Sequence, residues 1–126
     1  MGMENANFLV VEDSPTMRQL ISFSLKRFKN AKIIEAVDGV DALKKLSGPD
    51  KIDLILTDIN MPVMDGLDFC QQVRALPAYK FTPLLILTTE SDETKKQQGK
   101  GVGATGWLIK PFNPQQLVKV IGQVVK

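Results

Sequence analysis

Reactive side chains follow directly after several short apolar runs of this sequence. The residues in these places are Glu12 and Asp13 after Phe8–Val11, Asp58 after Ile52–Thr57, Thr88 after Leu84–Leu87, and Lys110 after Trp107–Ile109. One acid at the end of an apolar run is an ordinary turn residue. Three acids that came together in a crevice would repel one another and would favour a bound cation. Because carboxylates supply hard oxygen ligands, this set of residues indicates Mg²⁺ or Mn²⁺.

The sequence contains no histidine and a single cysteine among its 126 residues. The absence of histidine excludes Ser-His and Cys-His nucleophile pairs, and also zinc sites built on imidazole. Cys70 has no second cysteine with which to form an internal disulfide, which fits a reducing cytoplasm. The chemistry must therefore use carboxylates, hydroxyls, a lysine and a hard metal ion.

The length and charge of the chain limit the classes of protein further. A chain of 126 residues fits one domain with a sizeable core, which we expect at residues 8–126 after a disordered or tag-derived start at residues 1–7. The net charge of +2 is too small to indicate nucleic-acid binding. No apolar run is long enough to cross a membrane, and no signal peptide opens the sequence. We expect a cytoplasmic monomer that binds neither nucleic acid nor membrane.

Helical periodicity fills the stretches between the apolar runs. Ser14-Pro15 and Asn113-Pro114 each combine a capping residue with a proline suited to the first helical position. Asp38-Gly39 and Asp65-Gly66 precede two further amphipathic stretches. The sequence therefore predicts β-α units repeated five times along the chain, with no linker between them.

Strands that alternate with helices form a parallel sheet that is covered on both faces. The sequence therefore predicts an α/β fold, a doubly wound (βα)5 three-layer sandwich around a parallel five-stranded sheet. In such sheets ligands bind at the carboxyl ends of the strands. The acids, the threonine and the lysine all belong to that edge, so we expect a single site there.

Four short segments of the sequence together resemble one family. They are VVEDS (Val10–Ser14), TDINMPVMDG (Thr57–Gly66), LTTE (Leu87–Glu90) and KPF (Lys110–Phe112). In this order and spacing they are similar to the response-regulator receiver domains, and most of all to the stand-alone chemotaxis type. The resemblance covers the chain after about residue 7. It implies a flavodoxin-like sheet with the strand order 2-1-3-4-5.

The resemblance implies a role for each acid of the predicted site. Asp58 resembles the aspartate that accepts a phosphoryl group from a histidine of a sensor kinase. Asp13 resembles a direct ligand of Mg²⁺, and Glu12 resembles the acid that reaches the ion through water. Asp58 and the backbone carbonyl of Asn60 would complete the protein ligands.

The resemblance also assigns the residues that contact the phosphoryl group. Lys110 and Thr88 resemble the residues that bind its remaining oxygens. The Lys110–Pro111 bond resembles a cis peptide of the family, which directs the lysine into the site. Thr88 and Trp107 resemble the switch pair, in which the aromatic side chain moves inward once the hydroxyl contacts the phosphate. Trp107 departs from the family, which usually has Tyr or Phe at this position.

Phosphorylation in this family changes the surface of the fourth helix, the fifth strand and the fifth helix, which then binds a partner. The resemblance implies a sensor histidine kinase as the donor, and a downstream target such as a flagellar motor switch, with a phosphatase as a further partner. Asn60 and Glu90 stand two residues after the phosphoacceptor and the conserved hydroxyl, where the family tunes autodephosphorylation. Both are polar and admit water, which favours rapid loss of phosphate.

Other functions of the same fold remain open at this point. A phosphatase or phosphotransferase with an aspartyl-phosphate intermediate would also use Asp58 and Mg²⁺, but it typically has a second acid at the position of Asn60. A flavin-binding electron carrier needs a phosphate loop after the first strand, where Glu12 and Asp13 would repel phosphate. A receiver in a phosphorelay outside chemotaxis fits the same four segments.

A glycine-rich segment, Gly101–Gly106, matches the dinucleotide pattern G-x-G-x-x-G. That pattern binds a pyrophosphate only where it follows a strand and opens a helix. Here it closes a predicted helix and leads into a predicted strand. We therefore interpret it as a helix end and a turn.

Overall fold

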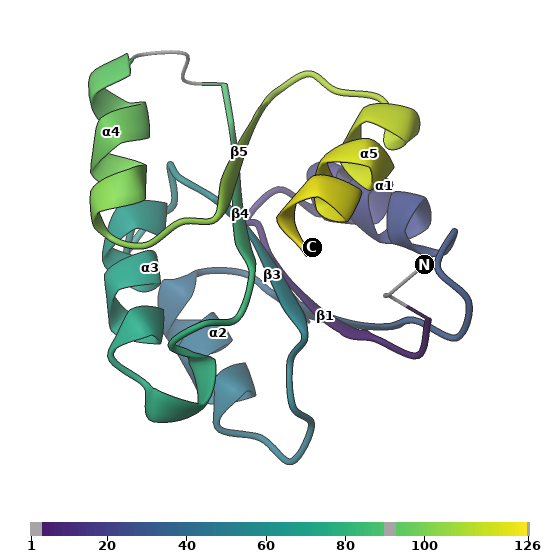
Figure 1. Cartoon of the computed structure of the whole chain (residues 1–126), viewed down its shortest axis with the longest axis horizontal. Coiled ribbons are helices and arrows are strands. Elements are labelled where there is room, and N and C mark those ends of the chain that lie inside the picture. The colour runs from purple at the N-terminus through teal and green to yellow at the C-terminus, as the bar shows by residue number, and fades with distance from the viewer. Residues whose placement is uncertain (1–3, 90–92, 126) are drawn as a thin grey trace.

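All five β-α units are present in the computed structural model, which describes residues 4–89 and 93–125 (Figure 1). The strands are β1 (Asn7–Val11), β2 (Lys32–Ala36), β3 (Leu54–Asp58), β4 (Leu84–Thr88) and β5 (Gly106–Ile109). The helices are α1 (Pro15–Leu25), α2 (Gly39–Leu46), α3 (Gly66–Arg74), α4 (Glu93–Gly101) and α5 (Pro114–Val124), with a short 3₁₀ helix η1 (Pro77–Tyr79) before β4.

The strands form one parallel sheet in the order β2-β1-β3-β4-β5, as predicted. Helices α1 and α5 cover one face of this sheet, and α2, α3 and α4 cover the other (Figure 1). This is the doubly wound, three-layer, flavodoxin-like sandwich. Because all strands run in the same direction, their carboxyl ends lie at one edge of the sheet.

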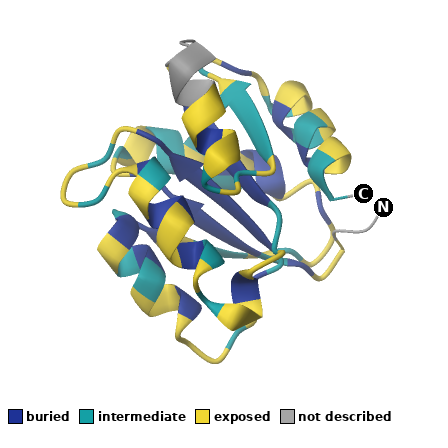
Figure 2. Cartoon of the chain, turned by 60° about the vertical axis from the view of Figure 1, so that its left-hand side comes forward, coloured by how far each residue is buried: buried dark blue, intermediate teal, exposed yellow. Residues whose placement is uncertain are grey.

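Apolar side chains of the central strands fill a hydrophobic core on each face of the sheet. Along β1, Phe8 and Val10 pack with α1 and α5, whereas Leu9 and Val11 pack with the helices of the other face. Strands β3 and β4 are buried along their whole length, as central parallel strands require. Figure 2 shows these buried strands between helices whose outer faces are exposed. Each fully buried Leu, Ile or Phe stabilises the fold by about 1.5–3 kcal/mol, which offsets the burial of charge at the site edge.

Four helices begin at the predicted capping residues. Ser14 Oγ accepts a hydrogen bond of 3.3 Å from a backbone amide in the first turn of α1. Asn113 forms a capping box with Gln116 at the start of α5. The carboxylates of Asp38 and Asp65 cap α2 and α3. These caps fix where each helix starts, and so they fix the loops that leave the carboxyl edge of the sheet.

Several strand boundaries differ by one or two residues from the predicted apolar runs, and the starts of β1 and β3 are the most informative. Strand β1 begins at Asn7, and the residues before it are packed, since Ala6 is buried and Asn5 N donates to Lys29 O at 2.8 Å. The structured part of the chain therefore begins before residue 8. Residues 1–3 lie outside the described part, so a disordered or tag-derived start stays a prediction for them. Strand β3 begins at Leu54 rather than at Ile52, whose amide donates to the Tyr79 hydroxyl instead of to a strand.

The glycine-rich segment ends α4, as predicted. Ala104 N donates to Gly99 O at 2.9 Å and Gly103 N donates to Lys100 O at 3.1 Å, which is the hydrogen-bond pattern of a Schellman C-cap. Gly103 has a φ of 97°, a conformation that side chains other than glycine adopt with difficulty. The segment therefore closes a helix rather than opening one, which removes the basis for a dinucleotide site.

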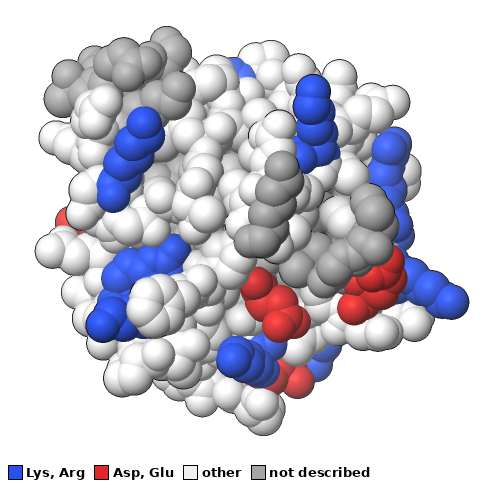
Figure 3. All heavy atoms as spheres, in the orientation of Figure 1, with Lys and Arg blue, Asp and Glu red and all other residues white. Residues whose placement is uncertain are grey.

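Charged side chains on one face of the molecule are spread out. On the face shown in Figure 3, Lys and Arg side chains lie in several separate groups between neutral side chains. Within residues 4–89 and 93–125, no helix has the length and apolar composition that a membrane span requires.

Candidate functional site

Three acids meet at the carboxyl edge of the sheet. Glu12 follows β1 and Asp58 ends β3, and these two strands are paired with Val11 opposite Thr57. This register makes Glu12 and Asp58 neighbours, and Asp13 follows at once. Carboxylate oxygens of the three residues lie within 4.8 Å of one another. The predicted acidic cluster is therefore present, and it could hold a metal ion.

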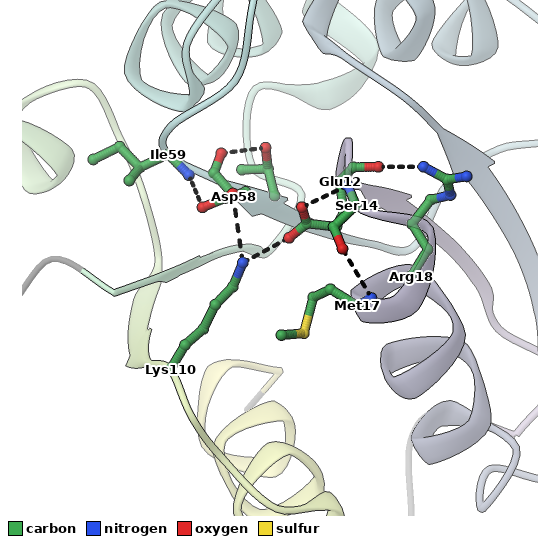
Figure 4. A network of polar contacts seen from close by, with 8 residues as sticks. Glu12, Ser14, Met17, Arg18, Asp58, Ile59 and Lys110 are labelled. Carbon is green, nitrogen blue, oxygen red and sulfur yellow. Dashed lines mark hydrogen bonds and ion pairs between the residues drawn. The ribbon is translucent and has the colours of Figure 1, made fainter.

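Glu12 is the most buried member of this cluster, with 2% of its surface exposed. Its Oε2 accepts a hydrogen bond of 3.0 Å from Ser14 N, and its Oε1 accepts one of 2.6 Å from Lys110 Nζ (Figure 4). Its backbone carbonyl accepts a further bond of 2.8 Å from Arg18 Nη1. Burial raises the pKa of the Glu12 carboxyl, and the hydrogen bonds from Lys110 and Ser14 oppose that rise. The carboxylate is thus held in one orientation in a place that disfavours its charge.

Asp58 is fixed through one carboxylate oxygen and turned toward a cation with the other. Its Oδ1 accepts a hydrogen bond of 2.7 Å from Ile59 N, and its Oδ2 lies 3.4 Å from Lys110 Nζ (Figure 4). The Thr57 hydroxyl donates to the Asp58 backbone carbonyl at 2.9 Å. With 9% of its surface exposed, Asp58 is accessible only from the loops at the carboxyl edge. Such a carboxylate is oriented to act as a nucleophile or as a metal ligand.

Lys110 joins two of the three acids. It follows β5, its backbone amide donates to Thr88 O at 2.7 Å, and the Lys110–Pro111 peptide bond is cis, as predicted. Its side chain is 10% exposed and contacts both Glu12 and Asp58. Removing one partner of a buried ion pair strongly destabilises the folded protein, because the other charge is left uncompensated. Lys110 therefore compensates part of the negative charge that the fold gathers here.

Thr88 and Trp107, the predicted switch pair, lie on neighbouring strands. Thr88 is fully buried at the end of β4, one position beyond the residue paired with Asp58. The six-membered ring of Trp107 lies under α4, where a β-carbon on Gly99 would come within 2.9 Å of its Cζ3 atom. The indole Nε1 is buried and has no hydrogen-bond partner in the described part of the chain. Gly99 thus provides the space in which a tryptophan packs inward at this position.

The structure describes only one of the two residues predicted to tune dephosphorylation, Asn60. The side chain of Asn60 is exposed and makes no side-chain hydrogen bond to the described residues. Glu90 lies outside the described residues.

Sequence reasoning missed two residues that orient Glu12. Ser14 was expected only as a helix cap, yet its backbone amide also holds the Glu12 carboxylate. Arg18 was not expected at all, although it bonds the Glu12 carbonyl and pairs with Glu35 at 3.1 Å. The signal for Ser14 lies in the sequence, because an acid two residues before the capping residue of a helix is within reach of the free amides there. No local pattern identifies Arg18, because its partners depend on how β2 and α1 pack.

Comparisons with known proteins agree with this geometry. The model of the response regulator receiver domain family matches residues 8–122. The chemotaxis protein CheY1 of Helicobacter pylori strain J99 is 38% identical over 109 residues, which cover 86% of this chain and 88% of that protein. The chemotaxis protein CheY homolog of Campylobacter jejuni is 35% identical over 117 residues, which cover 93% and 90%.

A solved structure gives the same result for the fold. The chemotaxis response regulator CheY4 of Vibrio cholerae has a TM-score of 0.88 and 48% sequence identity to this chain, over 94% of this chain and 98% of that one. This chain therefore belongs to the response regulator receiver domain family, as a CheY-like member.

Proposed function

We propose that this receiver domain accepts a phosphoryl group from a histidine of a sensor kinase onto Asp58. The observation that carries the proposal is the orientation of the Asp58 carboxylate. One oxygen is held by Ile59 N at 2.7 Å, and the other lies 3.4 Å from Lys110 Nζ. The second oxygen thus faces a cation at the place where a phosphoryl group would bring negative charge.

In the proposed reaction, an oxygen of Asp58 attacks the phosphorus atom in line with the N–P bond of the phosphohistidine. The new O–P bond forms as the N–P bond breaks, and the imidazole nitrogen keeps the electron pair and takes a proton from solvent. Lys110 stabilises negative charge on one phosphoryl oxygen, and the Thr88 hydroxyl donates to another. Because an ammonium group has three donors, Lys110 can keep its bond to Glu12 while it does this.

The donor set of the site fits Mg²⁺, and Mn²⁺ by the same chemistry. Its side-chain ligands are carboxylates, with no nitrogen or sulfur among them. We assign Asp13, Asp58 and the Asn60 backbone carbonyl to the ion, and Glu12 to a water bound on it. When bound, such an ion neutralises the carboxylates and the charge of the phosphoryl group. The chain itself holds the carboxylate oxygens together through the pairing of β1 with β3.

We assign the output to the surface of α4, β5 and α5. In this assignment the Thr88 hydroxyl and the Trp107 side chain couple the phosphoryl group to that surface, which then binds a downstream protein. The relatives named above are chemotaxis proteins. Their names support a place in chemotaxis or motility, with a target such as a flagellar motor switch. The protein would act in the cytoplasm as a monomer.

The return reaction releases phosphate through attack by water on the acyl phosphate. We assign its rate to Asn60 and to Glu90, which lies outside the described residues. The Asn60 side chain is exposed, which supports its assignment to the control of water access. Larger apolar residues at both positions should slow the loss of phosphate more than either change alone.

The experiment that tests the proposal uses acetyl phosphate with Mg²⁺, without any kinase. We expect the chain to gain one phosphoryl group, because the site itself supplies the charge stabilisation, and we expect Asp58→Asn to abolish this gain. Intact-protein mass spectrometry measures both. Asp68→Asn is the matched control, because Asp68 is an exposed acid on α3. Equal labelling of the Asp58→Asn protein would refute Asp58 as the acceptor.

A further inference from the structure

The loop after Asp58 contains a strained turn. Val63 has a φ of 69°, and Met64 N donates to Pro62 O at 2.7 Å across it. A hydrogen bond that spans one residue in this conformation forms a tight γ-turn, which is rare and strained. A β-branched side chain makes a positive φ especially unfavourable, whereas Gly or Asn adopts it readily. The backbone conformation at position 63 is therefore unfavourable for the valine that occupies it.

Packing within the chain does not account for this valine. The Val63 side chain is 82% exposed, while Met61 and Met64 on either side pack against the core of α2 and α3. Val63 thus adds strain to the folded state without adding buried apolar surface to it. Strained positions of this kind concentrate at functional sites.

The location of the loop indicates which function is involved. The loop leaves the sheet directly after Asp58 and is closed by Gly66 N, which donates to Ile59 O at 2.8 Å. Its Met64 side chain lies directly over Gly39 at the start of α2. Two valines close to Gly39 in the sequence are also exposed: Val37, two residues before it, to 48%, and Val40, directly after it, to 38%.

Exposed aliphatic side chains thus lie on two of the segments that leave the carboxyl edge of the sheet, the one after β2 and the one after β3. We call Val37, Val40 and Val63 the valine rim. A protein that delivers a phosphoryl group to Asp58 must bring a histidine to the carboxyl edge of the sheet, so its surface must cover the loops at that edge. The rim is apolar where the cluster is charged, and it offers contact area that a small phosphodonor does not use.

We propose that Val63 is a specificity-determining contact for the phosphohistidine domain of the sensor kinase. This inference rests on the proposed function. The valine docks on an apolar patch of that domain and thereby holds the phosphohistidine in line with Asp58. The tight turn presents the side chain outward in a fixed position, so little conformational entropy is lost on binding. Transfer from a phosphodonor without a protein surface does not depend on Val63.

The test compares two donors that share the same N–P bond. One is phosphoimidazole, and the other is a phosphorylated chemotaxis kinase from the source genome, selected as the one that labels this chain fastest. For Val63→Asn, the ratio of the kinase rate to the phosphoimidazole rate should fall about fivefold to tenfold. Its melting temperature should rise by about 3–6 °C, because asparagine relieves the strain at positive φ. Val63→Ala should lower the ratio equally but raise the melting temperature less than Val63→Asn, because alanine removes the β-branch and still disfavours a positive φ.

Phe81→Ser is the matched control, because Phe81 is 88% exposed and precedes β4 at the opposite edge of the sheet. It should leave the ratio of the two rates unchanged. An unchanged ratio in Val63→Asn, or an equal fall in Phe81→Ser, would overturn the docking role. A melting temperature of Val63→Asn no higher than that of the unsubstituted chain would overturn the strain argument. If the unsubstituted chain accepts phosphate from neither donor, the proposed function fails first and this inference fails with it.

Discussion

The two edges of the parallel sheet each hold a cation with several partners, and these partners differ in kind. At the amino edge, Arg74 donates to Gly103 O through Nε and Nη2, at 3.0 and 2.8 Å, and to Tyr79 O through Nη1 at 2.8 Å. All of these acceptors are neutral backbone carbonyls. At the carboxyl edge, Lys110 contacts the carboxylates of Glu12 and Asp58.

This difference separates a cation that bonds neutral backbone groups from a cation that neutralises carboxylates. The planar guanidinium of Arg74 joins the end of α3 to two loops, and the carbonyls it bonds would otherwise lack those donors. Lys110 instead balances part of a negative charge that the fold concentrates at one place. The charge at the carboxyl edge is therefore only partly neutralised, so a bound cation or phosphoryl group would change it. At the amino edge, the donors of Arg74 and the carbonyls already bond one another.

The largest expected effect on stability is at the amino edge. Arg74→Met should lower the free energy of unfolding by about 2–4 kcal/mol, because charge-assisted hydrogen bonds to two loops are lost. Labelling of Asp58 by acetyl phosphate should remain, measured well below the melting temperature. Urea denaturation gives the loss, and Arg27→Met provides the control, since Arg27 is exposed on the segment after α1. A loss no larger than in this control would contradict the assignment of Arg74 to stability.

At the carboxyl edge, Asp13→Asn should change metal binding rather than folding. We expect the affinity for Mg²⁺ to fall at least about tenfold, which corresponds to about 1.4 kcal/mol. Without metal, the variant should be as stable as the unsubstituted chain or more stable, because one member of a like-charged cluster is neutralised. Titration of Trp107 fluorescence with Mg²⁺ measures the affinity. If the affinity is unchanged, Asp13 is no ligand.

The smallest expected effect is a pH dependence that comes from Glu12. Burial raises the pKa of this carboxyl in the folded state above its ordinary value of 4.5. Between these two pKa values the folded state binds more protons than the unfolded state, so stability falls as pH rises through this window. In chelator-treated protein, Glu12→Gln should remove this slope, which is at most about 1.4 kcal/mol per pH unit.

Urea denaturation at a series of pH values between 4 and 7, in steps of about half a unit, follows this slope in both proteins. Asp68→Asn serves as the control, because Asp68 is an exposed acid on α3, away from the cluster. The same slope in the Glu12→Gln protein and in the unsubstituted chain would show that burial of Glu12 does not govern the dependence.

Much of this protein could be predicted from local patterns of sequence. The apolar runs and the caps at Ser14, Asp38, Asp65 and Asn113 act over a few residues, so they determined the five β-α units directly. Parallel strands bring their carboxyl ends to one edge, and this rule predicted that the acids and the lysine would share a site. The cis peptide before Pro111 was implied by the family resemblance and is present.

Only the tertiary structure decided how these groups meet. The bond between Lys110 and Glu12 joins residues 98 positions apart, so it depends on the order and register of the whole sheet. The inward position of Trp107 depends on the space left by Gly99 on another element. The positive φ of Val63 opposes the local preference of valine, so no propensity could have predicted it; the closure of the loop between Ile59 and Gly66 imposes it.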